Sequence, residues 1–162
     1  MRLCWTTSKR APIDIYKDRS NVSIAADENL IINRTNGQKL TIQTATVEKT
    51  CNSGTGTETI TGLIPANSIV LGVVARVVTI LAGTSLTTWS LGITSHTDHY
   101  GTTLALAAGT TVTPASHKVG DIPGPHYVTS ATNVLLTAAA GQFDSGVVRV
   151  TVWYITLDAP TS

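Results

Sequence analysis

The stretch SIVLGVVARVVTI, residues 68–80, constrains the fold more than any other part of the chain. Its apolar residues are nearly continuous, and many of them are β-branched, which fits a buried strand better than a helix. Such a strand is expected to be covered on both faces, either inside a sandwich or against a neighbouring subunit. The sequence therefore predicts a central core strand here.

Other stretches show the two-residue alternation of strands that have one buried face. Residues 86–93 place Trp89 among alternating apolar residues, and we interpret this tryptophan as part of the core. Residues 147–157 alternate between a valine-rich face and a face that carries Arg149 and Trp153. We interpret Trp153 as a core residue too, rather than as a sugar-binding ring, although it shares its face with Arg149. Further strands are predicted at residues 57–63, 126–130 and 133–139.

No segment has a sustained helical period, and Thr, Val, Ala and Leu dominate the composition. Turn-forming residues separate roughly seven or eight predicted strands, the spacing of an antiparallel sandwich. The predicted fold class is therefore all-β, a jelly-roll-like antiparallel β-sandwich preceded by an extended arm and a β-hairpin.

The hairpin is predicted from Asn36-Gly37 in NLIINRTNGQKLTIQT, residues 29–44. Asn-Gly suits a two-residue type I′ turn, and the resulting register places Ile31 opposite Ile42. A lone hairpin is marginally stable in water. It needs another surface, which its own domain, a sister subunit or a partner protein could supply.

Charge divides the chain into two parts. Residues 1–50 hold eight of the eleven Lys and Arg residues, and a Gly-, Ser- and Thr-rich stretch follows at residues 50–59. We place a boundary there. Residues 1–50 are predicted to form the arm and hairpin, an attachment or oligomerisation segment, and residues 51–162 are predicted to form the sandwich.

Several classes of function are disfavoured by composition and motifs. A net charge of +1 with 13% charged residues argues against nucleic-acid binding. No apolar run is long enough to span a bilayer, so membrane insertion is not expected. The chain lacks the motifs of serine hydrolases, phosphate-binding loops and zinc proteases. We therefore expect neither an enzyme nor a bound cofactor.

Cys4 and Cys51 are too few for a disulfide scaffold, and the first twelve residues lack the apolar stretch of a secretion signal. We interpret both cysteines as thiols of a protein made in a reducing cytoplasm.

Ionisable and aromatic residues concentrate in two stretches of an otherwise charge-poor region. An aromatic ring beside polar groups is the combination that saccharides bind, so these residues are candidate glycan ligands. The alternative is an ordinary polar hairpin between Ile93 and Leu104, with Gly101 at a turn. The candidates are His96, Asp98, His99 and Tyr100 in the first stretch, and Asp121, His126 and Tyr127 in the second.

The same two stretches also hold residue types that bind metal ions. Zinc needs about four ligands in a tetrahedral array, and His96 with His99 supplies two. Asp98, His117 or His126 would complete the set only if the two stretches converge. We predict no metal site.

The stretches IPANSIVLGVVARV, YGTTLALAAGT, VLLTAAAGQFDSGVVRVTVWYI and DAPTS carry a resemblance to known proteins. Across roughly residues 58–162 the chain resembles the C-terminal β-sandwich domains of virion fibre and head-spike proteins in tailed bacteriophages and gene transfer agents of alphaproteobacteria. The chain departs from long fibres because only residues 1–50 precede the module, with no shaft.

The resemblance implies a virion protein, assembled in the host cytoplasm, that forms a homotrimer and touches host surface polysaccharide. Residues 1–50 would join it to other virion proteins. The alternative is a capsid decoration protein that stabilises the head without binding a receptor.

Overall fold

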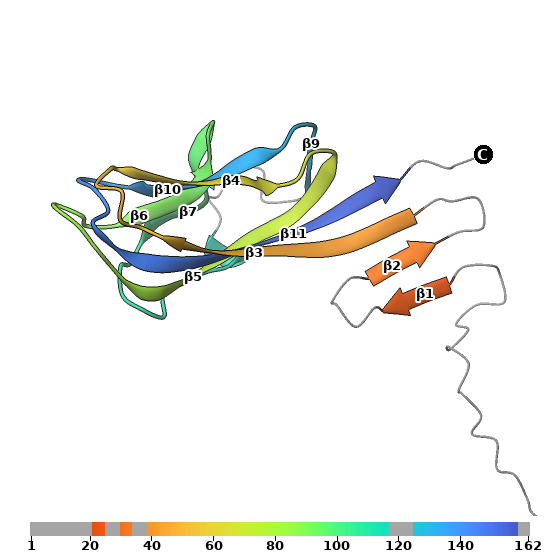
Figure 1. The fold of residues 1–162 in the computed structure, drawn as a ribbon, viewed down its shortest axis with the longest axis horizontal. Helices are drawn as coiled ribbons and strands as arrows, with labels where there is room; N and C mark the ends of the chain where they lie inside the picture. The colour runs from red at the N-terminus through yellow and green to blue at the C-terminus, as the bar shows by residue number, and fades with distance from the viewer. Residues whose placement is uncertain (1–20, 25–29, 34–38, 117–124, 159–162) are drawn as a thin grey trace, which may run out of the picture.

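The computed structural model describes residues 21–24, 30–33, 39–116 and 125–158 (Figure 1). These residues form eleven strands and one short 3-10 helix, so the predicted all-β class is confirmed. In chain order the elements are β1 (Asn21–Ile24), β2 (Leu30–Asn33), β3 (Lys39–Thr50), β4 (Thr57–Ile64), β5 (Ser68–Ala82), β6 (Trp89–Ile93), β7 (His96–Leu104), β8 (Thr111–Val112), η1 (Pro114–Ser116), β9 (His126–Val128), β10 (Thr132–Ala138) and β11 (Ser145–Asp158).

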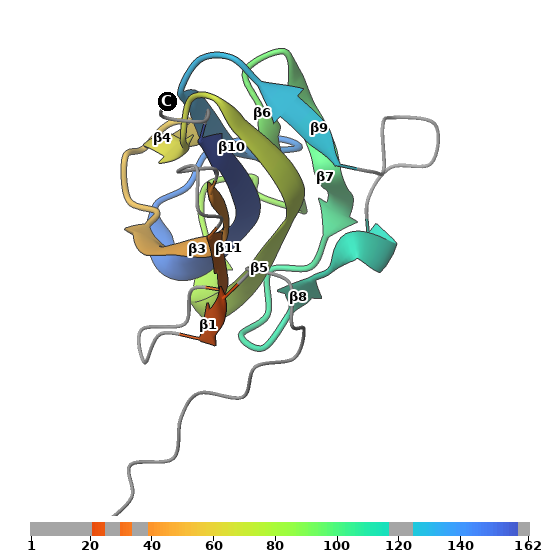
Figure 2. The same cartoon turned by 90° about the vertical axis from the view of Figure 1, so that its right-hand side faces the viewer.

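Two antiparallel sheets pack face to face (Figures 1 and 2). The large sheet has the order β1-β2-β3-β11-β5-β8, with β9 also paired to β5, and the small sheet has the order β4-β10-β6-β7. From β3 onwards the chain passes repeatedly from one sheet to the other, and the last strand, β11, returns to pair with β3. This path is that of a jelly roll, as predicted.

β11 carries the predicted alternation, and its inner side lies at the centre of the core. Val148, Val150 and Val152 are fully buried, whereas Arg149 and Trp153 on the other side are exposed. Small-sheet side chains cover the valines, and burying each apolar side chain contributes about 1.5–3 kcal/mol. These covering residues include Ile60, Leu91, Val134 and Leu136.

Trp89, at the start of β6, is a core residue, as predicted. Its side chain is fully buried, and its indole N–H donates a hydrogen bond to the Ala105 carbonyl at 2.9 Å. The bond satisfies the polar atom of a large buried ring.

β5 is a central strand of the large sheet, but only one of its faces is covered. Val73 and Val77 are fully buried, whereas Leu71, Val78 and Ile80 are exposed. Within the described residues the chain itself covers one face of β5 only, because the small sheet packs on one side, so the expected cover on both faces inside a sandwich is wrong; cover by a neighbouring subunit stays a prediction. We call the opposite side of β3, β11 and β5, which carries Arg149 and Trp153, the outer face.

The β2–β3 hairpin forms in a different register from the predicted one. Ile31 pairs with Thr41, and Leu30 pairs with Ile42, so the ladder is displaced by one residue. This register needs an odd number of loop residues, and Asn-Gly is compatible with such longer loops as well as with a two-residue turn. Asn36 and Gly37 themselves lie outside the described residues.

β3 pairs with β11 along its whole length, from Lys39 opposite Asp158 to Thr50 opposite Val147. Residues 39–50 are thus part of the large sheet, and the hairpin continues that sheet. Figure 1 shows the consequence: β1, β2 and the last residues of β11 lie at one end of the molecule, and the turns that follow β3 and precede β11 lie at the other.

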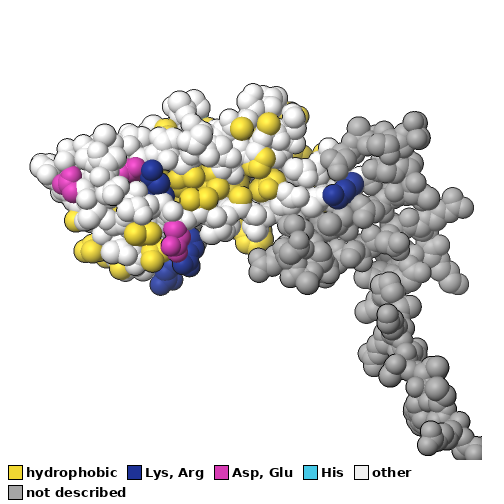
Figure 3. Space-filling view, viewed as in Figure 1, with side chains coloured by type: hydrophobic (Ala, Val, Ile, Leu, Met, Phe, Trp, Pro, Cys, Tyr) yellow, Lys and Arg dark blue, Asp and Glu magenta, His cyan; other side chains and the backbone are white. Residues whose placement is uncertain are grey.

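One long side of the sandwich runs between β3 and β4. Figure 3 shows a band of hydrophobic side chains between these strands, with few charged groups around it. Val47 belongs to this side: it pairs with the buried Val150 yet remains partly exposed, because the small sheet does not fully cover β3. Within the described ranges, no helix is long and apolar enough to cross a membrane.

Candidate functional site

Four of the predicted site residues lie on a strand rather than in a loop. The β6–β7 turn falls at residues 94–95, because Ile93 pairs with His96. Gly101 was expected at a turn but lies inside β7. Gly92 allows the close reversal, since a Cβ atom there would lie 2.1 Å from the His96 carbonyl oxygen. The four residues on β7 are His96, Asp98, His99 and Tyr100.

β9 brings the second predicted stretch against the first (Figure 2). The His126 ring lies edge-on to the His99 ring, with centroids 5.6 Å apart. His99 also meets Tyr100 at 4.7 Å and His96 at 6.1 Å. β9 belongs to the large sheet and β7 to the small one, so this histidine cluster, His96, His99 and His126, joins the two sheets at one edge.

Burial decides what this cluster can do. Tyr100 is 2% exposed, and burial raises the pKa of its hydroxyl far above the ordinary value of 10.0. His99 is also buried. A ring enclosed in this way cannot stack on a saccharide, so Tyr100 acts as a packing residue here. His96 alone of these three lies exposed on β7.

The remaining predicted residues separate. His126 pairs with the buried Val70 and faces the interior, whereas Tyr127 pairs with Ile69 and points to the outer face. Successive strand residues point to opposite sides, so the predicted His126-Tyr127 pair does not form one surface. Asp98 is half-buried on β7. Asp121 lies outside the described residues.

The convergence of the two stretches does not build a metal centre in the part of the chain that is described. No group of three His, Cys, Asp or Glu side chains there is arranged to hold a metal ion. His117, a further ligand considered from the sequence, lies outside those residues.

The outer face carries aromatic residues that sequence reasoning only partly found. Trp153 is 47% exposed on β11, and Tyr127 is 61% exposed on β9. The alternation of residues 147–157 placed Trp153 on one face with Arg149, but the interpretation of Trp153 as a core residue is wrong, because no described element buries its ring. Tyr127 joins the same face only through the pairing of β9 with β5, and no local sequence signal reports that long-range contact.

Polar groups follow Trp153 along β11 on this face. Thr151 and Thr46 share a hydroxyl–hydroxyl hydrogen bond of 2.8 Å. Arg149 then donates through Nε to Glu48 at 2.9 Å and lies opposite Arg76 of β5. Both partners of this ion pair are exposed, so solvent screening leaves it worth little to stability.

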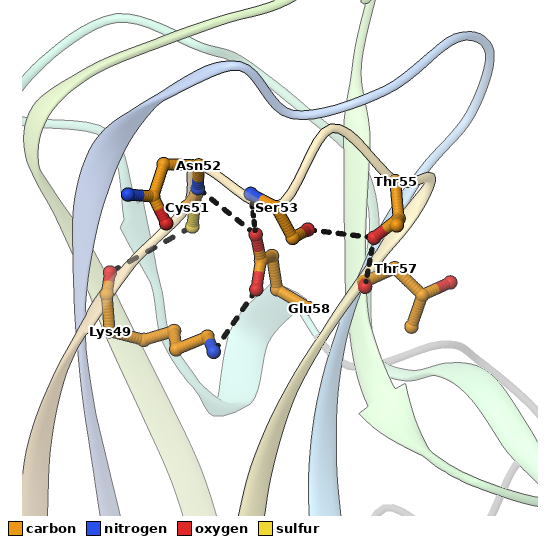
Figure 4. A network of polar contacts seen from close by, with 7 residues as sticks. All are labelled: Lys49, Cys51, Asn52, Ser53, Thr55, Thr57 and Glu58. Atoms are coloured by element: carbon orange, nitrogen blue, oxygen red, sulfur yellow. Dashed lines mark hydrogen bonds and ion pairs between the residues drawn. The ribbon is translucent and has the colours of Figure 1, made fainter.

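The turn between β3 and β4 is held by a buried carboxylate (Figure 4). Glu58 accepts the backbone N–H groups of Asn52 at 3.0 Å and Ser53 at 2.9 Å through Oε1. Its Oε2 lies 3.0 Å from Nζ of Lys49. Burial raises the pKa of Glu58, but the hydrogen bonds from Ser53 and the contact with Lys49 outweigh it, so the pKa lies below 4.5.

Cys51 lies beside this network. Burial, together with the nearby Glu58 charge, raises the pKa of its thiol to about 12, so the thiolate nucleophile is disfavoured. The contacts of Glu58 therefore stabilise the turn between β3 and β4 and do not form a reactive centre.

No family model and no curated protein matches the chain. Among solved structures it is similar to a chain of the cyanophage Pam1 capsid asymmetric unit, with 20% sequence identity and a TM-score of 0.48. The similarity covers 71% of this chain and 84% of that one. At this identity and TM-score it assigns no function.

Proposed function

We propose that this chain is a structural protein of a bacteriophage-type particle, attached at one end and acting by binding rather than by catalysis. The observation that carries the proposal is the pairing of Lys39 with Asp158. The chain enters and leaves the jelly roll at one end, and the turns after Thr50 and before Val147 lie at the other. Attachment through residues 1–38 would present those turns outward.

The sequence resemblance to virion fibre and spike domains supports this proposal. It covers about residues 58–162 and implies a jelly-roll-like module, which is the observed fold. The homotrimer and the contacts of the N-terminal segment with other virion proteins come from the resemblance and are part of the proposal.

Two finer functions follow from different features of the surface. The exposed rings of Trp153 and Tyr127 favour a spike or fibre module that binds host surface glycan. The exposed aliphatic residues Leu71, Val78 and Ile80 favour a decoration protein that packs against capsid subunits. We propose the glycan-binding module first, because Trp153 and Tyr127 share the outer face with the hydroxyls of Thr46 and Thr151, and a saccharide binds to aromatic rings beside polar groups.

Imaging of labelled protein on purified particles tests the proposal. The intact chain should occupy regular positions on the particle, and a variant lacking residues 1–38 should fold but fail to join it. A spike or fibre tip is expected, whereas positions throughout the capsid lattice would support decoration. Normal occupancy by the shortened variant would refute attachment through the N-terminal segment.

A further inference from the structure

Exposed aromatic residues are confined to the outer face within the described part of the chain. Trp89, Tyr100 and Phe143 are almost fully enclosed in the core, and Tyr154 is also buried. Trp153 and Tyr127 are the exceptions among the described tryptophan, tyrosine and phenylalanine rings, and both belong to the outer face. Large exposed apolar groups that share one face mark interaction sites.

The ladder register fixes the spacing of these two residues. Tyr127 pairs with Ile69, Ile69 pairs with Ile155, and Ile155 lies two residues beyond Trp153 on the same face. Strands about 4.8 Å apart with a rise of about 3.3 Å per residue then place the two Cα atoms about 12 Å apart. A short oligosaccharide lying flat on the sheet can reach both rings.

Both rings are positioned before any ligand arrives. The Tyr127 hydroxyl donates a hydrogen bond to Asn67 Oδ1 at 3.2 Å. Asn67 has a φ of 55°, in the turn that Ser68 closes by donating to the Pro65 carbonyl at 2.7 Å. Because this turn holds its partner, the exposed Tyr127 ring loses less freedom on binding.

Trp153 gains room from the residue beside it. Its cross-strand neighbour on β5 is Gly72, which adds no side chain beside the ring and lies buried, with Cγ of Pro114 3.9 Å from the position of a Cβ atom. The exposed ring can therefore offer a flat surface to the C–H groups of a sugar, while the hydroxyls of Thr151 and Thr46 lie one step further along the strands.

The charge on this face selects the kind of saccharide. Arg76 and Arg149 are cross-strand partners, and Glu48 pairs with Arg149. Among the described residues no carboxylate forms an ion pair with Arg76. The positive charge of Arg76 is therefore not balanced on this face. Arg76 lies past the Thr46–Thr151 pair as seen from Trp153, and its charge complements a carboxylate.

We propose that the outer face binds an acidic polysaccharide of the host cell surface. Trp153 and Tyr127 stack on its sugar rings, and Arg76 pairs with a uronate carboxylate. The inference rests on the proposed function and deepens it, because a protein on the surface of a particle would meet the polysaccharide of the host cell.

Calorimetry tests the proposed site, which we call the platform: Trp153, Tyr127 and Arg76. The probes are alginate and polygalacturonate oligosaccharides, and dextran oligosaccharides serve as a neutral reference. The intact chain should bind at least one uronate probe and not dextran. Trp153→Ala and Tyr127→Ala should each lower the association constant about tenfold, the effect expected of a central contact residue. Arg76→Gln should weaken uronate binding and reduce its dependence on salt. Ile80→Thr, which changes an exposed apolar residue near the other end of β5, should bind normally.

The platform is refuted if neither uronate probe binds, or if Trp153→Ala binds as the intact chain does. It is also refuted if Trp153→Ala changes the mass of the protein in solution, since the face would then be an interface between copies. Incorporation into particles is scored separately: Trp153→Ala should join particles normally, so loss of binding and loss of attachment are distinguishable.

Discussion

The ammonium of Lys49 lies 3.0 Å from the carboxylate of Glu58, across the turn that joins the two sheets. Lys49 is the inward-facing residue opposite Val148 on β11, and Glu58 is buried near the start of β4. The pair therefore ties β3 of the large sheet to β4, an edge strand of the small sheet. It also neutralises a charge that would be costly to bury alone.

Glu58→Ala should reduce the free energy of unfolding by about 1–3 kcal/mol, because two backbone N–H groups lose their acceptor. Urea unfolding at neutral pH measures the change. Glu48→Ala removes an exposed carboxylate of β3 that pairs with Arg149, and we expect it to cost at most about 1 kcal/mol. Equal losses in the two variants would contradict the assigned role of the buried carboxylate.

Stability should also depend on acid through Glu58. Its pKa is lowered in the folded protein, so its ionised form stabilises the fold above pH 4.5. That contribution is lost as the pH falls through the lower pKa of the folded state. Denaturation midpoints measured from pH 7 downward should fall less steeply for Glu58→Gln than for the intact chain. An unchanged slope would show that Glu58 is not the group responsible.

The two tyrosines of the predicted glycan site should respond in opposite ways. Tyr100→Ala removes a buried ring and should cost about 3–5 kcal/mol of stability. Tyr127→Ala changes a ring that is 61% exposed and should alter stability by no more than about 0.5 kcal/mol. Thermal unfolding of both variants makes the comparison, and a stable Tyr100→Ala protein would contradict the packing role of that ring.

Truncation should separate the hairpin from the sandwich. Removal of residues 1–38 leaves every β3–β11 pair in place, so the shortened chain should unfold cooperatively. Removal of residues 1–50 deletes β3 and leaves β11 without its neighbour along twelve residue pairs, so no cooperative transition is expected. Circular dichroism during urea unfolding distinguishes them. A folded chain without residues 1–50 would mean that β3 is dispensable.

The sequence predicted correctly those features of the fold that depend on residues close together in the chain. The alternation through Val148, Val150 and Trp153 appears in the sheet as expected, because a period of two fixes which residues face the core. The continuous apolar run at residues 68–80 could not reveal how many faces are covered, since that depends on what packs beside β5. The predicted register of the Asn-Gly hairpin differs from the observed one by one residue, because the sequence is compatible with more than one loop length.

The site was less predictable, because it is made by contacts between distant strands. The rings of His99 and His126 come from different sheets, and neither of the two sequence stretches predicts this contact. Tyr100 looked like a ligand-binding aromatic from its polar neighbours, yet its position on β7 turns it inward. Trp153 and Tyr127 are joined into one surface only by the register of β11, β5 and β9.

The β3–β11 ladder has a mechanical consequence. A pull on the segment before Lys39, resisted by contacts at the far end of the sandwich, acts along the strand axis and strains all twelve residue pairs together. A pull that separates Lys39 from Asp158 instead opens the ladder one pair at a time, from that end. The module should therefore withstand tension transmitted through its N-terminal segment far better than tension that separates Lys39 from Asp158.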